Sequence, residues 1–160
     1  MTQKFPLLEL LNNVSEIDIV YKKKVTCKVS ERPQINSSDD TYQLLMHYWN
    51  QDKIELIEEF KVLFLNRSNR VMQIMHVSSG GMTGTVADPR VIISVALRIG
   101  ACSMVLAHNH PSGSLKPSKQ DEDITYKLNQ AVKYFDIKIL DHLIVSTDGY
   151  YSFTDEGMLY

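Results

Sequence analysis

The chain has 160 residues, 44% of them hydrophobic, which suits one compact domain, with room for a short extension. Its formal net charge of −2 gives no overall attraction toward nucleic acid or an anionic membrane. No apolar stretch approaches the roughly 20 residues of a membrane-spanning helix, no signal-peptide pattern opens the chain, and two cysteines are too few for a disulfide framework. We therefore expect a cytoplasmic protein without a membrane partner.

Residues 1–36 are predicted to form a short N-terminal extension that contains a strand. Leucines between positions 7 and 11 could form a short amphipathic helix or a partner-binding segment. Residues 17–29 alternate in a way that predicts a strand, and Arg32-Pro33-Gln34 ends it. The basic run Lys22-Lys23-Lys24 is more typical of a solvated strand edge than of a binding patch.

Residues 37–160 are predicted to form the main domain. Ser37-Ser38-Asp39-Asp40 supplies N-cap residues for a helix that carries Trp49 into the core. Residues 58–65 and 71–77 predict two strands of a hairpin, the first with apolar side chains on both faces. Asp88-Pro89 starts a helix that ends at Gly100; because it is apolar nearly all round, we expect it to be heavily buried.

The remaining elements alternate between strand and helix. They are a strand over 103–107, a helix over 118–135, a strand over 139–145 and a last strand over 150–153. After the first helix the predicted order is therefore β-β-α-β-α-β-β. That order indicates an α/β or α+β fold, with a mixed β-sheet flanked by helices.

Two histidines and an acid stand out where the strand over 103–107 ends. Side chains two apart on a strand share a face, so His108 and His110 could present nitrogen atoms to one metal ion. The following helix carries an apolar stripe at Ile124, Leu128, Ala131, Val132 and Phe135. At about 100° per residue, Asp121 falls within this stripe, whereas Glu122 and Asp123 fall outside it. A carboxylate buried there needs a partner, and a metal ion held by the histidines would be one.

The same residues also have a purely structural interpretation. Ser118 and Asp121 fit a capping box, in which both side chains accept hydrogen bonds from free backbone N–H groups at a helix start. Histidines beside a Pro-Gly loop can hydrogen-bond to loop carbonyls. For a bare pair of histidines the structural interpretation is the commoner one. The position of Asp121 favours the metal-binding interpretation, but the structural interpretation remains the commoner one for such a pattern.

The spacing and the surrounding sequence resemble a known family. His108 and His110, then seven residues, Ser118, two residues and Asp121 match the JAMM signature of the JAB/MPN metalloproteases. Residues 107–113, Pro117-Ser118, Leu140-Asp141-His142 and residues 54–71 resemble the RadC branch of that family. The resemblance covers roughly residues 37–153. It implies a JAB/MPN domain, which is a cytidine-deaminase-like three-layer sandwich around a mixed sheet.

The resemblance also implies a zinc site. Its ligands would be His108, His110 and Asp121, with a water in the fourth position, which is the catalytic rather than the structural pattern. In the family, a Ser stabilises the oxyanion of the reaction, and this role falls to Ser118. Because that ligand set is complete, His142 is expected to have a buried supporting role and not to bind the metal.

The family's catalytic glutamate has two candidates in this chain. It orients and deprotonates the zinc-bound water and passes the proton to the leaving amine. The Glu-x-Phe pattern of the RadC branch selects Glu58. Strand alternation also puts Glu58 on the face of Phe60, whereas Glu59 shares the side of Lys61. We therefore assign this role to Glu58 and keep Glu59 as the reserve.

The expected activity is that of a JAMM-type zinc hydrolase, a metallopeptidase or isopeptidase that cleaves an amide bond in a protein or peptide. The alternative is a DNA-repair-associated or regulatory module of the RadC type that binds metal without peptidase activity. Longer RadC-type proteins carry an N-terminal helix-hairpin-helix domain, and residues 1–36 show neither the length nor the glycine pattern for it. Only the DNA-repair label of the family therefore suggests nucleic acid as a partner. The presence of Glu58 and Ser118 favours the enzyme over the module.

Overall fold

The computed structural model describes residues 27–80 and 87–159. Its elements are η2 (Val29–Glu31), α2 (Ser38–Tyr48), β1 (Glu59–Leu65), β2 (Val71–Ser79), α3 (Pro89–Ile99), β3 (Ser103–Asn109), α4 (Lys119–Lys133), β4 (Lys138–Ser146) and β5 (Gly149–Ser152). The predicted order of helices and strands from residue 37 onward is confirmed, and so is the α+β class.

The predictions for the N-terminal extension fall mostly outside the described residues. This applies to the helix proposed around residues 7–11, to the basic run, and to the strand over 17–29 up to residue 26. At its C-terminal end the strand prediction is wrong, because Val29 begins the 3-10 helix η2. A local hydrogen bond accounts for the turn: the backbone N–H of Lys28 donates to the Glu31 carboxylate at 2.9 Å.

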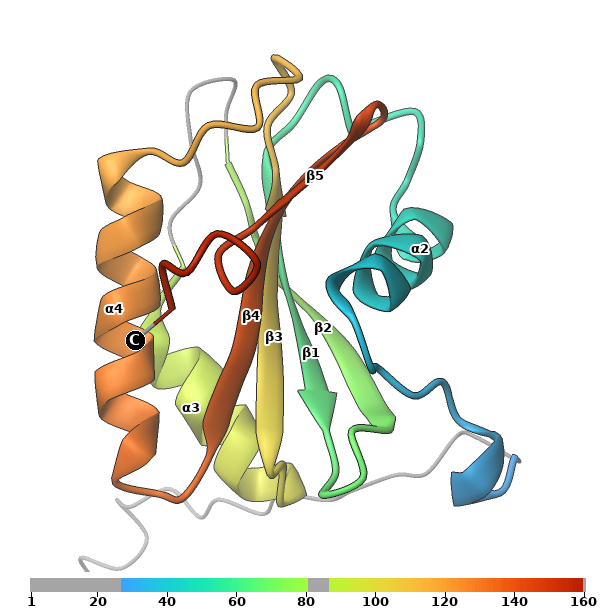
Figure 1. Cartoon of the computed structure of the whole chain (residues 1–160), viewed down its shortest axis with the longest axis vertical. Coiled ribbons are helices and arrows are strands. Elements are labelled where there is room, and N and C mark those ends of the chain that lie inside the picture. The colour runs from blue at the N-terminus through green and yellow to red at the C-terminus, as the bar shows by residue number, and fades with distance from the viewer. Residues whose placement is uncertain (1–26, 81–86, 160) are drawn as a thin grey trace, which may run out of the picture.

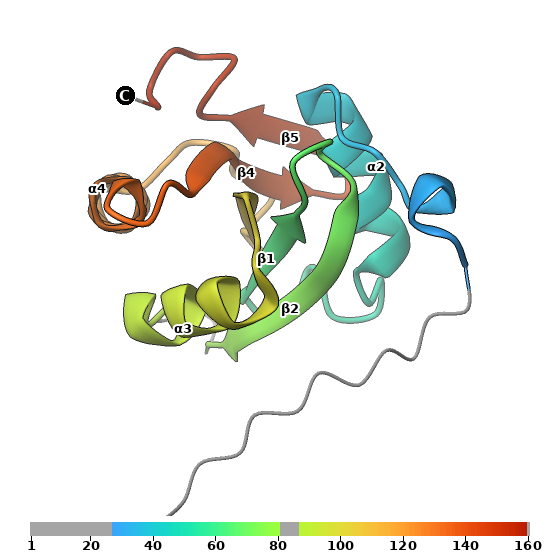
Figure 2. The same cartoon turned by 90° about the horizontal axis from the view of Figure 1, so that it is seen from below.

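The five strands form one mixed sheet in the order β2-β1-β3-β4-β5. β1 lies antiparallel to both β2 and β3, β3 is parallel to β4, and β5 returns antiparallel to β4. The parallel pair needs a crossover connection, which α4 supplies. In Figures 1 and 2, α3 and α4 cover one face of the sheet and α2 covers the other, so the domain has three layers.

The sheet buries apolar side chains on both faces, as the sequence of β1 predicts. Phe60, Val62 and Phe64 belong to the core beneath α3 and α4. Leu63 and Leu65 belong to the core beneath α2, together with Trp49 of the segment that follows that helix. The two-residue period of β1 therefore places alternate side chains in two separate cores.

The prediction that the helix after Asp88 is heavily buried is wrong. In α3, Ile92 and Ala96 are buried, but Val91 and Leu97 are exposed. The helix lies in an outer layer, so only its sheet-facing side is covered. For a similar reason Phe135 is exposed: α4 ends at Lys133, before the apolar stripe reaches it.

Within the described residues, no helix combines the length and the apolar character needed to cross a membrane.

The core beneath α3 and α4 should dominate the stability of the domain. Phe64 is 0% exposed in the middle of β1, whereas Tyr134 at the end of α4 is 89% exposed. We expect Phe64→Ala to lower the free energy of unfolding by about 3–5 kcal/mol, because it removes buried surface and leaves a cavity. The matched control Tyr134→Ala should change it by less than about 0.5 kcal/mol. Urea denaturation followed by circular dichroism measures both, and equal losses would contradict the layer assignment.

Candidate metal centre

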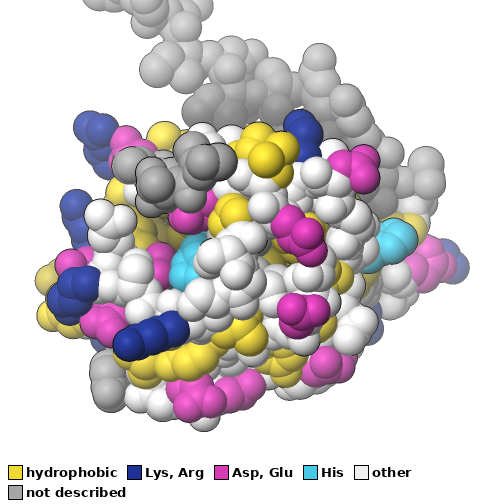
Figure 3. All heavy atoms as spheres, turned by 90° about the horizontal axis from the view of Figure 1, so that it is seen from above, with side chains coloured by type: hydrophobic (Ala, Val, Ile, Leu, Met, Phe, Trp, Pro, Cys, Tyr) yellow, Lys and Arg dark blue, Asp and Glu magenta, His cyan; other side chains and the backbone are white. Residues whose placement is uncertain are grey.

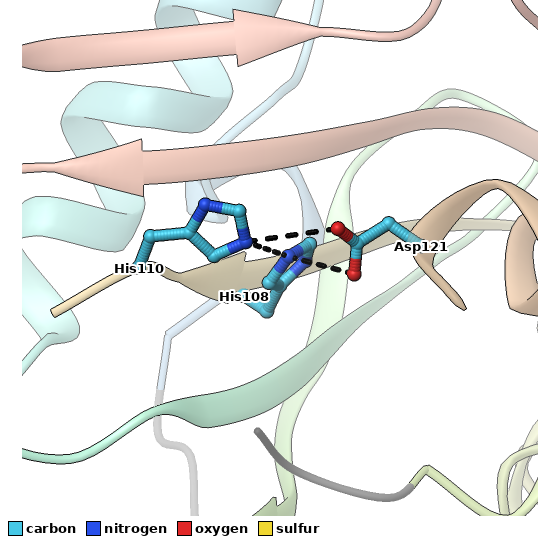
Figure 4. A group of neighbouring side chains, drawn as sticks. All are labelled: His108, His110 and Asp121. Carbon is cyan, nitrogen blue, oxygen red and sulfur yellow. Dashed lines mark hydrogen bonds and ion pairs between the residues drawn. The ribbon is translucent and has the colours of Figure 1, made fainter. Parts of the chain in front are cut away.

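Three side chains converge where β3 ends and α4 begins: His108, His110 and Asp121 (Figure 4). One ligand atom from each lies within 4.8 Å of the other two. His108 Nε2 is 3.0 Å from His110 Nε2 and 3.1 Å from Asp121 Oδ1. His110 Nε2 is 3.6 Å from Asp121 Oδ2. The structure thus brings together the three residues that the sequence singles out, in a group that could hold a metal ion.

The helical phase of α4 selects Asp121 from the three neighbouring acids, as the apolar stripe predicts. The Asp121 side chain is 13% exposed, compared with 38% for Glu122 and 67% for Asp123. Lys119 at the start of the helix pairs with both of the outer acids, at 3.2 and 3.1 Å. Of these three acids, Asp121 is the one that faces the sheet.

The capping box at the start of α4 is also present. The backbone N–H of Ser118 donates to Asp121 Oδ2 at 2.7 Å, and the backbone N–H of Asp121 donates to Ser118 Oγ at 3.2 Å. Asp121 Oδ1 remains directed at His108. The structural and the metal-binding interpretations of these residues are therefore compatible, because one carboxylate has enough lone pairs for both.

The charges of the group are strongly coupled. Burial alone would raise the pKa of Asp121, but hydrogen bonds from His108 and His110 outweigh it and hold the pKa well below the usual range. The hydrogen bond to Asp121 raises the pKa of His110, and burial opposes the shift. His110 Nδ1 donates to the carbonyl of Ser114 at 2.7 Å, so neutral His110 directs the lone pair of Nε2 into the group. Imidazole nitrogen and carboxylate oxygen suit a divalent transition-metal ion.

Glu58 lies one residue before β1, on the side of the metal group. In the antiparallel β1–β3 register Phe60 is opposite His108. Extending this register by two residues beyond the ends of the pairing puts Glu58 opposite His110. The negative charge of Glu58 contributes to the raised pKa of His110. Its backbone carbonyl accepts a hydrogen bond from Gly80 at 2.8 Å, which ties this point to the end of β2.

Glu59 points to the opposite face of the sheet. Its carboxylate is 2.6 Å from Lys61 Nζ, and that ammonium group lies over the Trp49 ring at 4.4 Å from the centroid. The alternation that grouped Glu59 with Lys61 is confirmed. The structure thus separates the two candidate glutamates and leaves only Glu58 on the side of the histidines.

His142 is completely buried beside the group and does not join it. Its Nε2 is 2.8 Å from His108 Nδ1, and its Nδ1 is 2.5 Å from Thr125 Oγ1. Burial, and then the nearby charge of His108, hold the pKa of His142 well below its usual value. His142 thus contacts His108 without joining the candidate metal group, which fits the supporting role expected of it.

Asn109 is a site residue that the sequence reasoning missed. It is fully buried, and its amide donates to the carbonyls of Ile54 and Ile57 at 2.6 and 2.9 Å. Its side-chain oxygen accepts from the backbone N–H of Glu59 at 2.7 Å. Asn109 thus holds the segment that carries Glu58. The available signal was a polar residue between two histidines on a strand, whose side chain must point to the other face.

The group is accessible from the end of the sheet. Figure 3 looks onto this end and shows histidine and acidic side chains at the surface, with apolar side chains among them. The His110 and Asp121 side chains are partly exposed, whereas His108 is buried. A hollow of about 230 Å³ lies beside His110, and Glu55 and Asp148 are among the residues that line it. A ligand could therefore approach His110 and Asp121 directly.

The fold and the site together define an α+β domain with a histidine–carboxylate group at the end of a sheet strand. The model of the RadC-like JAB domain family matches residues 35–158, and the chain belongs to this family. Two similar proteins are the UPF0758 protein of Flavobacterium johnsoniae, 50% identical over 101 residues, and the UPF0758 protein YfjY of Escherichia coli, 41% identical over 102 residues. These alignments cover 63% and 64% of this chain, but 44% and 64% of the relatives. The names of these relatives state no activity.

Metal binding at this group should depend on pH. A metal ion competes with the proton that the raised pKa of His110 retains, and binding releases that proton. With Zn²⁺ as the probe, we expect affinity to rise with pH by roughly tenfold per unit for each displaced proton until His110 is neutral. In the metal-free protein, the charged His110–Asp121 pair stabilises the fold fully below the ordinary histidine pKa of about 6.5. This contribution is lost as the pH rises through the raised pKa.

Chelator competition measures the affinity, and thermal unfolding measures the stability of the metal-free protein. His47→Gln, at an exposed histidine of α2, is the control and should leave both profiles unchanged. An affinity that does not vary between about pH 6 and pH 8 would contradict the assignment of His110 as a ligand.

Proposed function

We propose that the protein is a zinc-dependent hydrolase of JAMM type, a metallopeptidase or isopeptidase that cleaves an amide bond in a protein or peptide. The observation that carries the proposal is the convergence of His108, His110 and Asp121, with Glu58 opposite His110 and Ser118 at the helix start beside them. Membership of the RadC-like JAB family supports it. A group that served only to stabilise the fold would not need Glu58.

The ligand set fits zinc in a catalytic role. Two imidazole nitrogens and one carboxylate oxygen are common zinc ligands, and three protein ligands leave a position for water. A zinc ion bound there would polarise the scissile carbonyl and lower the pKa of a bound water to about 7. The remaining steps would fall to residues of this chain.

Glu58 is proposed to act as the general base and then as the acid. Its carboxylate would take a proton from the attacking water and deliver it to the nitrogen of the leaving amine. The strand register that brings Glu58 opposite His110, and the effect of its charge on the pKa of His110, support this role. The hydrogen bonds from Asn109 to the backbone of residues 54–59 would hold the carboxylate in place.

Ser118 is proposed to stabilise the negative charge that develops on the carbonyl oxygen. In the capping box, Ser118 Oγ accepts the N–H of Asp121, so the cap does not use the hydroxyl hydrogen. That hydrogen could donate to an oxyanion beside the ligands. The N-terminal end of α4 adds a favourable dipole at the same place.

The substrate is proposed to be a protein or peptide, handled in the cytoplasm. The free thiols of Cys27 and Cys102 fit a reducing compartment. The hollow beside His110, with Glu55 and Asp148 in its lining, offers no attraction for the phosphates of a nucleic acid. The net charge of −2 points the same way.

Glu58→Gln tests the proposed chemistry. We expect the rate of amide hydrolysis to fall about 10²–10⁴-fold, because the amide cannot accept the proton, while bound zinc stays at the wild-type level. Zinc-loaded protein is incubated with a proteome-derived peptide library, and new amino groups are counted by mass spectrometry. The control is Glu59→Gln, whose side chain faces the other side of the sheet and which should retain turnover.

Two results would count against the proposal. Zinc-loaded wild type that releases no more amines than chelator-treated protein would contradict hydrolysis and favour the metal-binding module without peptidase activity. Glu58→Gln that turns over at the wild-type rate would contradict the role of Glu58.

Ser118→Ala separates catalysis from helix capping. We expect it to reduce kcat by about 10²–10³-fold through loss of the oxyanion donor, and to cost about 1 kcal/mol of stability through loss of the cap. Ser37→Ala is the matched control, because Ser37 forms the same capping box with Asp40 at the start of α2, outside the metal group. Turnover, zinc content and urea denaturation are measured on both. Equal turnover in the two variants would show that Ser118 acts only as a cap.

A further inference from the structure

We propose that Thr125 and His142 are positioning residues that hold His108 in the tautomer able to bind a metal ion. They would do so through a chain of three hydrogen bonds that ends on the backbone of another proposed ligand, Asp121. The inference rests on the proposed metal site, and it explains how the protein orients the nitrogen of His108 toward that site before a metal ion binds. It concerns two residues outside the ligand set.

The chain of hydrogen bonds is fixed at the end where it meets Asp121. Thr125 Oγ1 lies 2.5 Å from the backbone carbonyl oxygen of Asp121, one helical turn earlier. A carbonyl oxygen only accepts, so the Thr125 hydroxyl donates to it. The hydroxyl has one hydrogen, and its second close partner is His142 Nδ1, also at 2.5 Å. In this second bond Thr125 must accept, so Nδ1 of His142 carries a hydrogen.

The environment of His142 keeps its ring neutral. The residue is 0% exposed, and its ring stacks on Phe153 with centroids 4.9 Å apart and an interplanar angle of 19°. The Phe60 ring lies on another side, at 5.6 Å. An imidazolium is costly in such surroundings. A neutral ring with its hydrogen on Nδ1 has a lone pair on Nε2, which faces His108 Nδ1 at 2.8 Å.

The tautomer of His108 follows from that lone pair. Nδ1 of His108 must donate to His142. When His108 carries two hydrogens, the second one is on Nε2 and is donated to Asp121; when it carries one, Nε2 has the lone pair that a metal ion can use. This is the atom that faces Asp121 Oδ1 and His110 Nε2. The opposite tautomer would direct an N–H group at the metal position and block ligation. His110 reaches the same tautomer by a shorter route, through the Ser114 carbonyl.

The arrangement has a mechanical and an electrostatic consequence. A histidine ligand generally donates its other N–H to a carboxylate, a carbonyl or water. Here the carbonyl is reached through two intermediate side chains and belongs to Asp121, so the first turn of α4 and the ring of His108 are coupled. Because the intermediates are neutral, they add no negative charge near the metal position, which would keep a bound ion strongly electrophilic.

Thr125→Val and Thr125→Ser form a matched pair of variants. Valine has nearly the shape of threonine but removes the acceptor for His142 Nδ1, whereas serine keeps it. We expect Thr125→Val to weaken zinc affinity about 10–100-fold and Thr125→Ser to stay within about threefold of wild type. Competition with a chromogenic chelator gives the dissociation constants, and thermal unfolding of the metal-free proteins shows whether the fold is retained.

A spectroscopic measurement tests the tautomer directly. ¹H–¹⁵N correlation spectra of the histidine rings in metal-free protein, at about pH 9 and so above the ordinary histidine pKa of about 6.5, distinguish protonation at Nδ1 from protonation at Nε2. His108 should be protonated at Nδ1 in wild type and Thr125→Ser, and should populate both tautomers in Thr125→Val.

Neutral wild-type His108 with its single hydrogen on Nε2, and none on Nδ1, would overturn the inference without any variant. Zinc affinity of Thr125→Val within about threefold of wild type would overturn it as well. If the wild-type protein binds no zinc, the proposed function fails, but the tautomer of His108 still decides whether the chain of hydrogen bonds exists.

Discussion

The antiparallel pairing of β1 with β3 is the constraint on which the site depends. It places Phe60 opposite His108, and the two rings stack almost in parallel, with an interplanar angle of 5°. A shift of one residue would reverse the face of every side chain on the strand. Asn109 opposes such a shift, because its side-chain oxygen accepts the backbone N–H of Glu59 at the start of the strand. The register that buries the core thus also brings Glu58 opposite His110.

The start of α4 imposes a second constraint, and it uses one carboxylate twice. Asp121 closes the capping box with one oxygen and faces His108 with the other. A helix N-terminus favours negative charge, so the cap helps to keep this carboxylate ionised despite its burial. Hydrogen bonds from the two histidines act in the same direction and lower its pKa. Helix capping therefore reinforces the ionised state in which Asp121 could bind a metal ion.

Features set by local periodicity could be predicted from the sequence. The two-residue period of β1 assigned its side chains to two faces, and the helical phase of α4 selected Asp121 over Glu122. Features set by the layer in which an element lies could not, and the exposed side of α3 is the example, because its apolar residues say nothing about what covers them. The hydrogen-bond partners of Asn109 were also out of reach, since Ile54 lies 55 residues away along the chain.

Glu58 and Glu59 differ in their surroundings because successive residues of a strand point to opposite faces of the sheet. The two carboxylates are neighbours in sequence, yet one comes opposite His110 and the other contacts Lys61 on the opposite face. Burying the Lys61 ammonium requires a partner, and Glu59 supplies it at 2.6 Å, with the Trp49 ring on the same cation. Glu59 therefore neutralises the buried charge of Lys61. Glu58 instead comes on the histidine side, where its negative charge contributes to the raised pKa of His110.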